Sequence, residues 1–322
     1  MNIAVIGTNF ISDNFCDAAK TVDGVKILAV YSRTDARGKF FAEKHGIERV
    51  YSDFDAMLAD GDIDSVYVAS PIFAHKEQSL RAMALGKHVL CEKMMAATLD
   101  EFYEMKAASE KYGRVLLEAM RPAHDPLIAK VRENLPKIGK IRRAHLSFCQ
   151  YSSRYDKFKA GIVENAFNPR IKNSALSDIG IYPLCLALSL FDEPKTLDSH
   201  SIFLENGFEG AGALTLGYPD KIVTVEYSKI IDGIIPSVIE GECGSVTINK
   251  ISAPTEIRLK LRGKPDEIIA VSDNEENMCY EIAAFRDMCK GELDHKPYLA
   301  ITELQQKTVE KSYNLTGANK YF

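Results

Sequence analysis

The chain has 322 residues, of which 46% are hydrophobic and 26% are charged. This balance is typical of a folded globular protein and excludes a disordered or collagen-like chain. At about 150 residues per domain, the length favours two domains. There are 40 lysine and arginine residues against 45 acidic ones, a formal charge of −5, so a basic surface that binds nucleic acid is not expected.

No segment has the pattern of a membrane span, because the longest charge-free apolar stretch, residues 179–191, is shorter than the ~20 residues that a bilayer requires and contains a proline. The N-terminus has no basic flank and reaches Asp13 early, unlike a secretory signal. The 7 cysteines are scattered and never spaced C-x-x-C. We therefore expect no disulfide framework, no metal site and a reducing, cytoplasmic location.

The first third of the chain alternates short apolar strands with helices. The predicted strands are 2–6, 25–32, 49–51, 65–69, 88–91 and 115–118. The predicted helices are 10–21 (beginning near Ser12), 35–45, one from the Ser52-Asp53 capping signal to about 59, 74–85 and 98–112. Apolar strands separated by helices predict a doubly wound parallel α/β sheet, which binds ligands beyond the carboxyl ends of its strands.

After residue 120 the pattern changes. The predicted helices are 126–135, 176–190, 275–290 and 299–316, and the predicted strands are 140–151, 197–205, 211–217, 221–227, 234–241, 244–249, 256–261 and 267–271. Short strands separated by turns predict an α+β domain with one large, mainly antiparallel sheet and helices on one face. The expected domains are thus 1–120, which binds a dinucleotide, and 121–322, which binds substrate and forms a homodimer or higher oligomer through the uncovered sheet face.

The turn after the first strand keeps only the first glycine of a G-x-G-x-x-G dinucleotide fingerprint. Asn9 tolerates a left-handed backbone, and Ser12 is small and can cap a helix, so a pyrophosphate can lie on the N–H groups of the helix N-terminus. A plain turn without a ligand remains the alternative. The candidate cofactor-binding residues of this turn are Gly7, Thr8, Asn9, Phe10, Ile11 and Ser12.

The second strand ends without the acidic residue that often binds the ribose hydroxyls of NAD. Ser32 and Arg33 stand there instead, and an arginine can engage the 2′-phosphate of NADP. We therefore expect NADP(H) rather than NAD(H) if a cofactor binds. The alternative is a solvated surface arginine.

Three segments together resemble the Gfo/Idh/MocA family of oxidoreductases. They are V-A-S-P-I-F-A-H (68–75), A-L-G-K-H-V-L-C-E-K (84–93) and D-I-G-I-Y-P (178–183). The last is similar to the D-x-G-x-Y form of the glucose–fructose oxidoreductase and dimeric dihydrodiol dehydrogenase branch. The resemblance covers almost the whole chain and implies a Rossmann domain followed by an α+β domain.

This chain departs from the family pattern in two places. The glycine fingerprint reads G-T-N-F-I-S, and Met94 replaces the proline of the usual E-K-P motif. A cis peptide bond before methionine costs ~2.5–4 kcal/mol, against under ~1 kcal/mol before proline. Because Met94 replaces this proline, the backbone that positions Lys93 can differ from that of the family motif.

The resemblance implies that Lys93, Asp178 and Tyr182 are catalytic. Lys93 follows a strand at its carboxyl end and can polarise a carbonyl or share in proton transfer. Tyr182 can exchange the proton if a cation lowers its pKa from ~10, while Asp178 orients substrate and holds Lys93. Gly180 lets a ligand approach the backbone. The alternatives are a surface Lys93–Glu92 pair, a helix-capping aspartate and a half-buried tyrosine.

Other candidates follow from their place in the resemblance or near the Asp178 helix. The further cofactor-binding candidates are Ser70, Pro71, His75, Glu92 and Lys93 itself, although a lone histidine near a helix start is commonly a capping or surface residue. The substrate-binding candidates are Arg121, Tyr151, Tyr155 and Arg170, for which the alternative is a solvated loop.

The expected function is an NADP(H)-dependent oxidoreductase that moves a hydride between the nicotinamide and a carbonyl or hydroxyl carbon of a sugar, polyol or similar small molecule. A dinucleotide-binding sensor without turnover is the alternative, motivated by the altered glycine turn and the missing proline. A third possibility is a bound nicotinamide recycled during glycoside cleavage. We expect no nucleic-acid or membrane partner.

Overall fold

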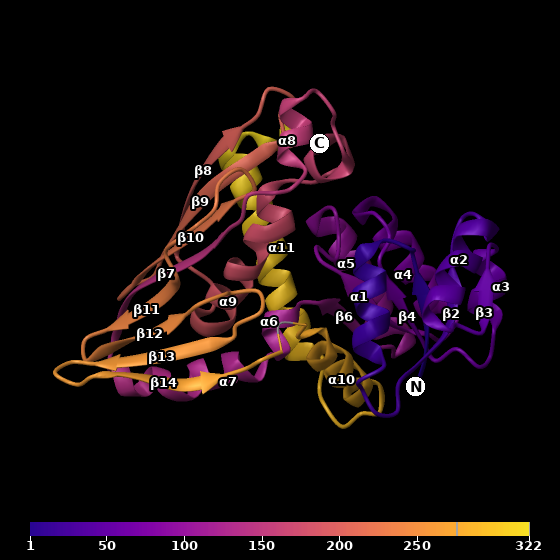
Figure 1. Cartoon of the computed structure of the whole chain (residues 1–322), viewed down its shortest axis with the longest axis horizontal. Helices are drawn as coiled ribbons and strands as arrows, with labels where there is room; N and C mark the ends of the chain where they lie inside the picture. The colour runs from indigo at the N-terminus through magenta and orange to yellow at the C-terminus, as the bar shows by residue number, and fades with distance from the viewer. Residues whose placement is uncertain (275, 322) are drawn as a thin grey trace. The chain divides into compact units, whose positions relative to one another are not determined.

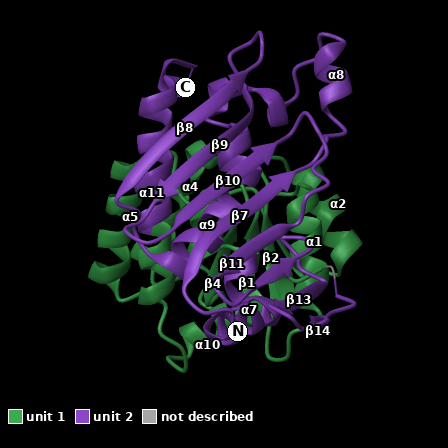
Figure 2. Ribbon diagram, turned by 90° about the vertical axis from the view of Figure 1, so that its left-hand side faces the viewer, with its two compact units in different colours: residues 1–121, 276–302 green, residues 122–275, 303–322 purple. Residues whose placement is uncertain are grey.

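A computed structural model describes residues 1–274 and 276–321 (Figure 1). The chain forms two compact units: Met1–Arg121 with Glu276–Thr302, and Pro122–Glu275 with Glu303–Phe322 (Figure 2). The first unit thus includes residues 276–302, which the predicted division after residue 120 assigns to the second domain. None of the described helices is both long and apolar enough to cross a membrane.

The first unit contains a parallel six-stranded sheet in the order β3-β2-β1-β4-β5-β6, which confirms the doubly wound α/β fold. The strands are β1 Asn2–Ile6, β2 Lys26–Tyr31, β3 Arg49–Tyr51, β4 Ser65–Val68, β5 His88–Glu92 and β6 Leu116–Ala119. The strand order reverses between β1 and β4, so the carboxyl ends of these two strands border the crevice in which such sheets bind ligands.

Helices connect these strands in sequence. They are α1 Phe10–Ala19, α2 Asp35–His45, α3 Phe54–Ala59, η1 Ile72–Ala74, α4 His75–Ala84 and α5 Leu99–Tyr112, with α10 Met278–Cys289 added from the C-terminal part. The short α6 Arg121–His124 and the long α11 Lys296–Thr316 each include residues of both units. Two glycines with a left-handed backbone, Gly46 and Gly113, end α2 and α5.

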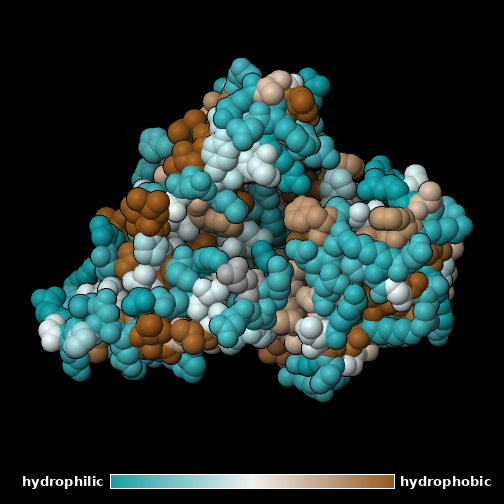
Figure 3. Space-filling model, in the orientation of Figure 1, coloured by the Kyte–Doolittle hydropathy of each residue, from teal (hydrophilic) through white to brown (hydrophobic). Residues whose placement is uncertain are grey.

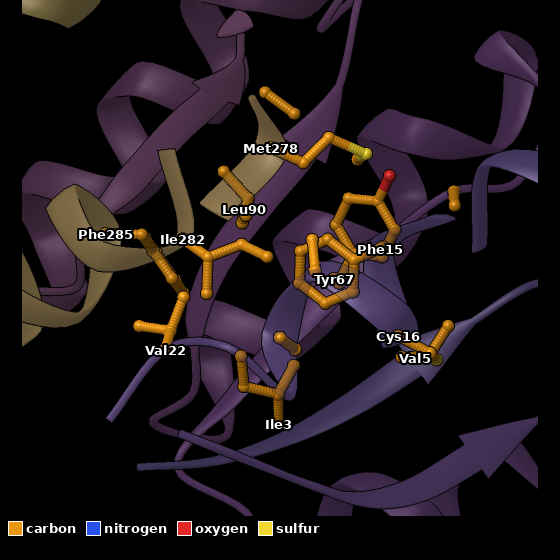
Figure 4. Packing of buried hydrophobic residues seen from close by; sticks show 14 of the residues in the cluster. Ile3, Val5, Phe15, Cys16, Val22, Tyr67, Leu90, Met278, Ile282 and Phe285 are labelled. Carbon is orange, nitrogen blue, oxygen red and sulfur yellow. The ribbon is translucent and has the colours of Figure 1, made fainter. Parts of the chain in front are cut away.

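The six-stranded sheet is covered on both faces. Alternate strand residues belong to two separate hydrophobic clusters, for example Val5 to one and Ile6 to the other. Figure 4 shows that Met278, Ile282 and Phe285 of α10 join the first of these clusters. Part of the core of the first unit therefore comes from the last fifth of the sequence.

The second unit contains an eight-stranded sheet in the order β14-β13-β12-β11-β7-β10-β9-β8. Its strands are β7 Ile141–Cys149, β8 Thr196–Phe203, β9 Glu209–Gly217, β10 Ile222–Ser228, β11 Ser237–Gly241, β12 Gly244–Ile248, β13 Glu256–Leu261 and β14 Asp266–Val271. Every adjacent pair is antiparallel except β7 and β10. The predicted mainly antiparallel sheet is confirmed.

The remaining elements of this unit are mostly short. They are α7 Pro126–Asn134, η2 Leu135–Ile138, α8 Tyr155–Lys159, η3 Asn165–Phe167, η4 Pro169–Ile171, η5 Leu176–Gly180, α9 Ile181–Phe191 and η6 Ala318–Tyr321. The predicted helix 176–190 divides into a turn of π-helix, η5, and the α-helix α9. In Figure 2 no described helix lies in front of β8, β9, β10 and β7.

The uncovered sheet face is mixed in character rather than apolar. Ile202 and Ile222 are more than half exposed on it, but Asp198 and Glu226 belong to the same face and are exposed too. Figure 3 views the molecule from another side, on which hydrophilic residues separate small hydrophobic groups. The dimer was expected because an apolar sheet face would need to be buried. This face carries exposed charged residues as well as apolar ones, so an interface here would bury both kinds.

Candidate active site

Gly7 follows β1 at the point where the backbone passes closest to β4. Its φ is +114°, and a Cβ at this position would lie 2.8 Å from the carbonyl oxygen of Ala69. Both features require a glycine. The one glycine that remains of the fingerprint is thus fixed by the packing of the turn against the end of β4.

Asn9, rather than Ser12, caps α1. Its backbone is extended (φ −101°, ψ 179°), and its Oδ1 accepts hydrogen bonds from the N–H groups of Ile11 and Ser12, both at 3.1 Å. Its Nδ2 donates to the Ala69 carbonyl at 2.8 Å. Asn9 thus does not use the left-handed backbone that an asparagine tolerates, and the expected helix start near Ser12 is wrong, because Ser12 is buried inside α1.

The Asn9 cap changes which groups can hold a pyrophosphate. The N–H groups of Ile11 and Ser12 already have an acceptor, whereas no hydrogen bond engages those of Thr8 and Asn9 within residues 1–274 and 276–321. These two amides suit a phosphate beside the helix N-terminus. The turn thus fits a dinucleotide, through fewer helix amides than the sequence predicts.

Arg33 extends from the end of β2 into solvent. Ser32 is buried, and its hydroxyl accepts a hydrogen bond from the N–H of Thr34 at 3.4 Å. Among the described residues, no carboxylate or carbonyl engages the Arg33 guanidinium. Thr8, Arg37 and Lys44 border a hollow of about 360 Å³ between the glycine turn and α2. Two cationic side chains, Arg37 and Lys44, thus line this hollow together with Asp13, whose carboxylate pairs with Lys44 at 2.8 Å.

His75 links the end of β4 to the segment that follows β5. Its buried ring lies between two backbone carbonyls, with Nε2 2.8 Å from the oxygen of Ser70 and Nδ1 3.1 Å from that of Met94. Burial lowers the pKa of the ring. The Ser70 hydroxyl donates to Gln78 at 2.6 Å, and Pro71 precedes η1. His75 therefore braces the backbone, while direct contact of Ser70, Pro71 or His75 with a cofactor stays a prediction.

Lys93 directly follows β5, at the carboxyl end of the sheet. The preceding Glu92 is buried and accepts hydrogen bonds from the Tyr67 hydroxyl and, at 3.3 Å, from the backbone N–H of Lys93. Burial raises the pKa of Glu92, while the charges of Lys93 and Arg121 lower it. The peptide bond between Lys93 and Met94 is cis. Because Glu92 is internal, a surface Lys93–Glu92 pair is excluded.

Two further buried glutamates, Glu118 and Glu281, interact with this segment or with the charge of Glu92, and the sequence does not point to either. Glu118 in β6 accepts from the backbone N–H of Met95 at 2.8 Å and from the hydroxyl of Thr302 at 3.2 Å. Glu281 in α10 is fully buried, and its carboxyl oxygens have no hydrogen-bond partner among the described residues. Burial and the charge of Glu92 raise the pKa of Glu281 well above its ordinary value.

Asp178 lies in the π-helical turn η5, and Tyr182 lies in the first turn of α9. Asp178 is not a helix cap, because the N-capping positions of η5 and α9 are Ala175 and Gly180. Its Oδ2 accepts a hydrogen bond from the ammonium of Lys229 at 2.6 Å. Tyr182 is 6% exposed, and its ring centroid is 5.8 Å from that of Phe148. The sequence gives no indication of Lys229, because it follows β10 and is remote from Asp178 along the chain.

Gly180 does not open the backbone to a ligand. A Cβ at this position would lie 2.7 Å from Cγ of Tyr227, whose ring packs directly against the glycine. The expectation of a ligand approach at Gly180 is therefore wrong. The absent side chain lets η5 pack against β10.

The candidate substrate residues are dispersed and have other partners. The Tyr151 hydroxyl pairs with Asp156 and Lys159, each at 2.7 Å. Tyr155 stacks in an aromatic cluster, and Arg170 is exposed. Arg121 is the first residue of α6, and its charge acts on Glu92 and Glu281 in the first unit. Roles of these four residues in binding substrate stay predictions.

Lys93 belongs to the first unit, whereas Asp178 and Tyr182 belong to the second. Each unit thus supplies proton-handling groups of the type that a carbonyl reduction needs. That the lysine and the tyrosine meet at one ligand remains a prediction.

The family is decided by comparison with known proteins. Residues 1–120 match the family described as "Oxidoreductase family, NAD-binding Rossmann fold". The chain is 39% identical over 290 residues to the scyllo-inositol 2-dehydrogenase (NADP(+)) IolU of Bacillus subtilis (strain 168), covering 90% of this chain and 88% of the relative. The chain belongs to the Gfo/Idh/MocA family.

More distant Gfo/Idh/MocA relatives share the full length of the fold. The trans-1,2-dihydrobenzene-1,2-diol dehydrogenase of Mus musculus is 26% identical, with 97% of this chain and 96% of the mouse protein covered. The crystal structure of KijD10, a 3-ketoreductase from Actinomadura kijaniata, in complex with NADP and TDP-benzene superposes with a TM-score of 0.86 at 21% identity, over 98% of each chain. The protein is thus an NAD(P)-binding oxidoreductase, as its sequence predicts.

Proposed function

We propose that this protein is an NADP(H)-dependent dehydrogenase or reductase that acts on a CH–OH or carbonyl group of a polyol, a sugar or a related small molecule. The observation that carries the proposal is the position of Lys93, held at the carboxyl end of β5 beside the buried Glu92. The name of the B. subtilis relative supports an inositol-like polyol as the first substrate to try.

In this proposal the chain's own residues orient the reactants and move the proton. The amides of Thr8 and Asn9 hold a phosphate of the cofactor, and Arg33 binds its 2′-phosphate. The nicotinamide, when bound, accepts or supplies the hydride. Lys93 polarises the substrate oxygen, Tyr182 exchanges its proton, and Asp178 accepts a hydrogen bond from a substrate hydroxyl.

A nicotinamide absorbance assay tests the activity. The purified protein is incubated with NADP⁺ or NAD⁺ and scyllo-inositol, myo-inositol, aldoses and trans-diols, and with NADPH and their oxidised forms. We expect turnover of at least one polyol or its ketone. Lys93→Met should lower kcat by about 10²-fold or more and leave NADPH affinity largely intact, because the main loss is of a group that acts on the substrate oxygen.

Lys111→Met is the matched control for this variant. Lys111 lies in the last turn of α5, whereas Lys93 precedes that helix, so the two lysines lie at opposite ends of the connection between β5 and β6. This control should leave kcat unchanged. Full turnover by the Lys93→Met variant would show that Lys93 is not the catalytic group.

A dinucleotide-binding sensor without turnover is the second candidate. Only the glycine turn favours it, because Asn9 occupies two helix amides that a pyrophosphate would otherwise use. It predicts nucleotide binding by calorimetry but no reaction with any compound of the panel.

The remaining expectations concern assembly and location. We propose a homodimer through the open face of the large sheet, where Ile202 and Ile222 lie among charged residues. All seven cysteines are free thiols, which suits a reducing cytoplasm.

A further inference from the structure

Lys229 is a buried cation of the second unit that contacts the proposed catalytic residue Asp178. It follows β10, is 4% exposed, and donates from Nζ to Oδ2 of Asp178 at 2.6 Å. The Asp178 side chain is 34% exposed. The ammonium thus lies on the inner side of a carboxylate that also reaches the surface of the unit.

Three other groups fix the position of this ammonium. Nζ donates to the Ala166 carbonyl at 2.6 Å and lies 5.0 Å and 5.2 Å from the ring centroids of Phe167 and Phe208. The carbonyl and the ring faces attract the cation but carry no negative charge. The Asp178 carboxylate supplies a negative charge to Lys229.

A buried ammonium requires hydrogen bonds and a counter-charge, since transfer of an isolated charge from water is very unfavourable. A charge-assisted bond of this length also restricts the orientation of the carboxylate. The carbonyl and the two rings hold the lysine, and the lysine in turn holds Asp178 within the π-helical turn that precedes Tyr182.

We propose that Lys229 is a positioning residue that fixes the Asp178 carboxylate for substrate binding. The inference rests on the proposed function, because it assigns a role to Lys229 only through Asp178. An oriented carboxylate is an acceptor for the hydroxyl groups of a neutral polyol. The same negative charge disfavours a substrate that places its own carboxylate or phosphate at this position.

Lys221 provides a matched control in the same unit. It precedes β10 at the opposite end from Lys229, pairs with Asp220 at 2.7 Å, and has ring centroids of Tyr218 and Phe191 at 5.2 Å and 5.8 Å. It therefore repeats the combination of one carboxylate and two aromatic rings. Lys221 differs from Lys229 in one respect: its carboxylate partner, Asp220, does not belong to the proposed active site.

The test is a double-mutant cycle measured with NADP⁺ and scyllo-inositol, or with the compound of the panel above that is turned over fastest. The variants are Lys229→Met, Asp178→Asn and the double variant, with Lys221→Met as control. We expect Lys229→Met to lower kcat/KM by roughly 10- to 100-fold and NADPH affinity by less than twofold. In the Asp178→Asn background the same change should lower kcat/KM by less than threefold.

The outcomes separate this inference from the proposed function. If no compound is turned over, the proposed function is wrong, and if Asp178→Asn alone leaves kcat/KM unchanged, the role assigned to Asp178 in substrate binding is wrong. If Asp178→Asn lowers kcat/KM but Lys229→Met does not, or if Lys229→Met lowers it equally in both backgrounds, the role of Lys229 in positioning Asp178 is overturned. Lys221→Met should leave kcat/KM within twofold of the wild-type value.

Further variants and a stability measurement distinguish loss of positioning from a folding defect of Lys229→Met. Lys229→Arg keeps the cation, and we expect it to retain at least tenfold more kcat/KM than Lys229→Met. If Lys229→Met does not fold, Lys229→Gln, which can still donate to the Ala166 carbonyl, takes its place in the cycle with the same expected values. The melting temperatures of the four proteins of the cycle, measured without substrate, should be non-additive, and additive values would contradict the coupling.

Discussion

Arg33 is exposed at the end of β2, and its guanidinium has no partner among residues 1–274 and 276–321, so we expect it to select the cofactor. Arg33→Ala should weaken NADPH binding by about 1–3 kcal/mol and hardly change NADH binding, because it removes a charge-assisted contact to a phosphate that only NADPH carries. Calorimetric titration with both nucleotides measures the difference.

The control for this prediction is Lys39→Ala, which removes an exposed cation of α2 that pairs with Asp35 at 2.7 Å. It should change neither affinity appreciably. Equal losses for NADPH and NADH in the Arg33→Ala protein would instead mean that the arginine supports the fold of the turn.

Short motifs are the signal that nominates single candidate residues. Lys93, Asp178 and Tyr182 are candidates because each belongs to a short segment that resembles a family motif. Lys229 and Glu281 were not, because their significance comes from contacts with Asp178 and Glu92 that form only in the folded chain. Gly180 shows the opposite error, since a motif glycine proved to accommodate the ring of Tyr227.

The packing of η5 against β10 depends on that glycine. Gly180→Ala should destabilise the protein by about 1–3 kcal/mol, because the added Cβ would lie 2.7 Å from Cγ of Tyr227 in a fully packed region. Thermal unfolding measures the change. Gly61→Ala, at a position with no atom within 4 Å of the added Cβ, should have little effect. An unchanged melting temperature for Gly180→Ala would show that η5 shifts without cost.

Helices and strands with clear local signals were predicted almost residue for residue. The helix 35–45 and the strand 49–51 match α2 and β3, since a left-handed Gly46 and β-branched or aromatic residues define them. The start of α1 was misjudged because Asn9 and Ser12 can both cap a helix. The short helices α6 and α8 were missed because one turn leaves no periodic pattern.

Glu281 makes the stability of the whole chain depend on pH. Its pKa is raised in the folded state, by burial first and by the charge of Glu92 second, whereas in the unfolded chain it ionises near its ordinary value. As pH rises from that ordinary value towards the folded one, the folded state must keep a proton that the unfolded state releases, so stability falls by up to about 1.4 kcal/mol per pH unit.

Glu281→Gln should therefore raise the free energy of unfolding by about 1–3 kcal/mol at pH 8 and leave it nearly unchanged at pH 4, because the amide carries no proton to lose. Urea unfolding at the two pH values measures this. Glu292→Gln, at an exposed position after α10, should have no such effect. A Glu281→Gln protein that is less stable at pH 8 would show that the carboxylate is ionised in the fold.

The assignment of the chain to two units could be predicted only in part from the sequence. The change from alternating strands and helices to successive strands placed the boundary near residue 120, where the first segment of unit 1 ends. The helix over 278–289 was predicted as an element, but its apolar stripe does not tell which sheet it covers. Only the contacts of Met278, Ile282 and Phe285 assign it to the first unit.

This return of α10 matters for how the protein is made. A ribosome releases the six strands of the first sheet early, yet the side chains that complete one of its faces emerge only after the entire second sheet has been synthesised. Until then Phe15 and Val22 lack their partners from α10 (Figure 4). The hydrophobic core of the first unit therefore stays incomplete during synthesis, and this unit can finish folding only after α10 has been made.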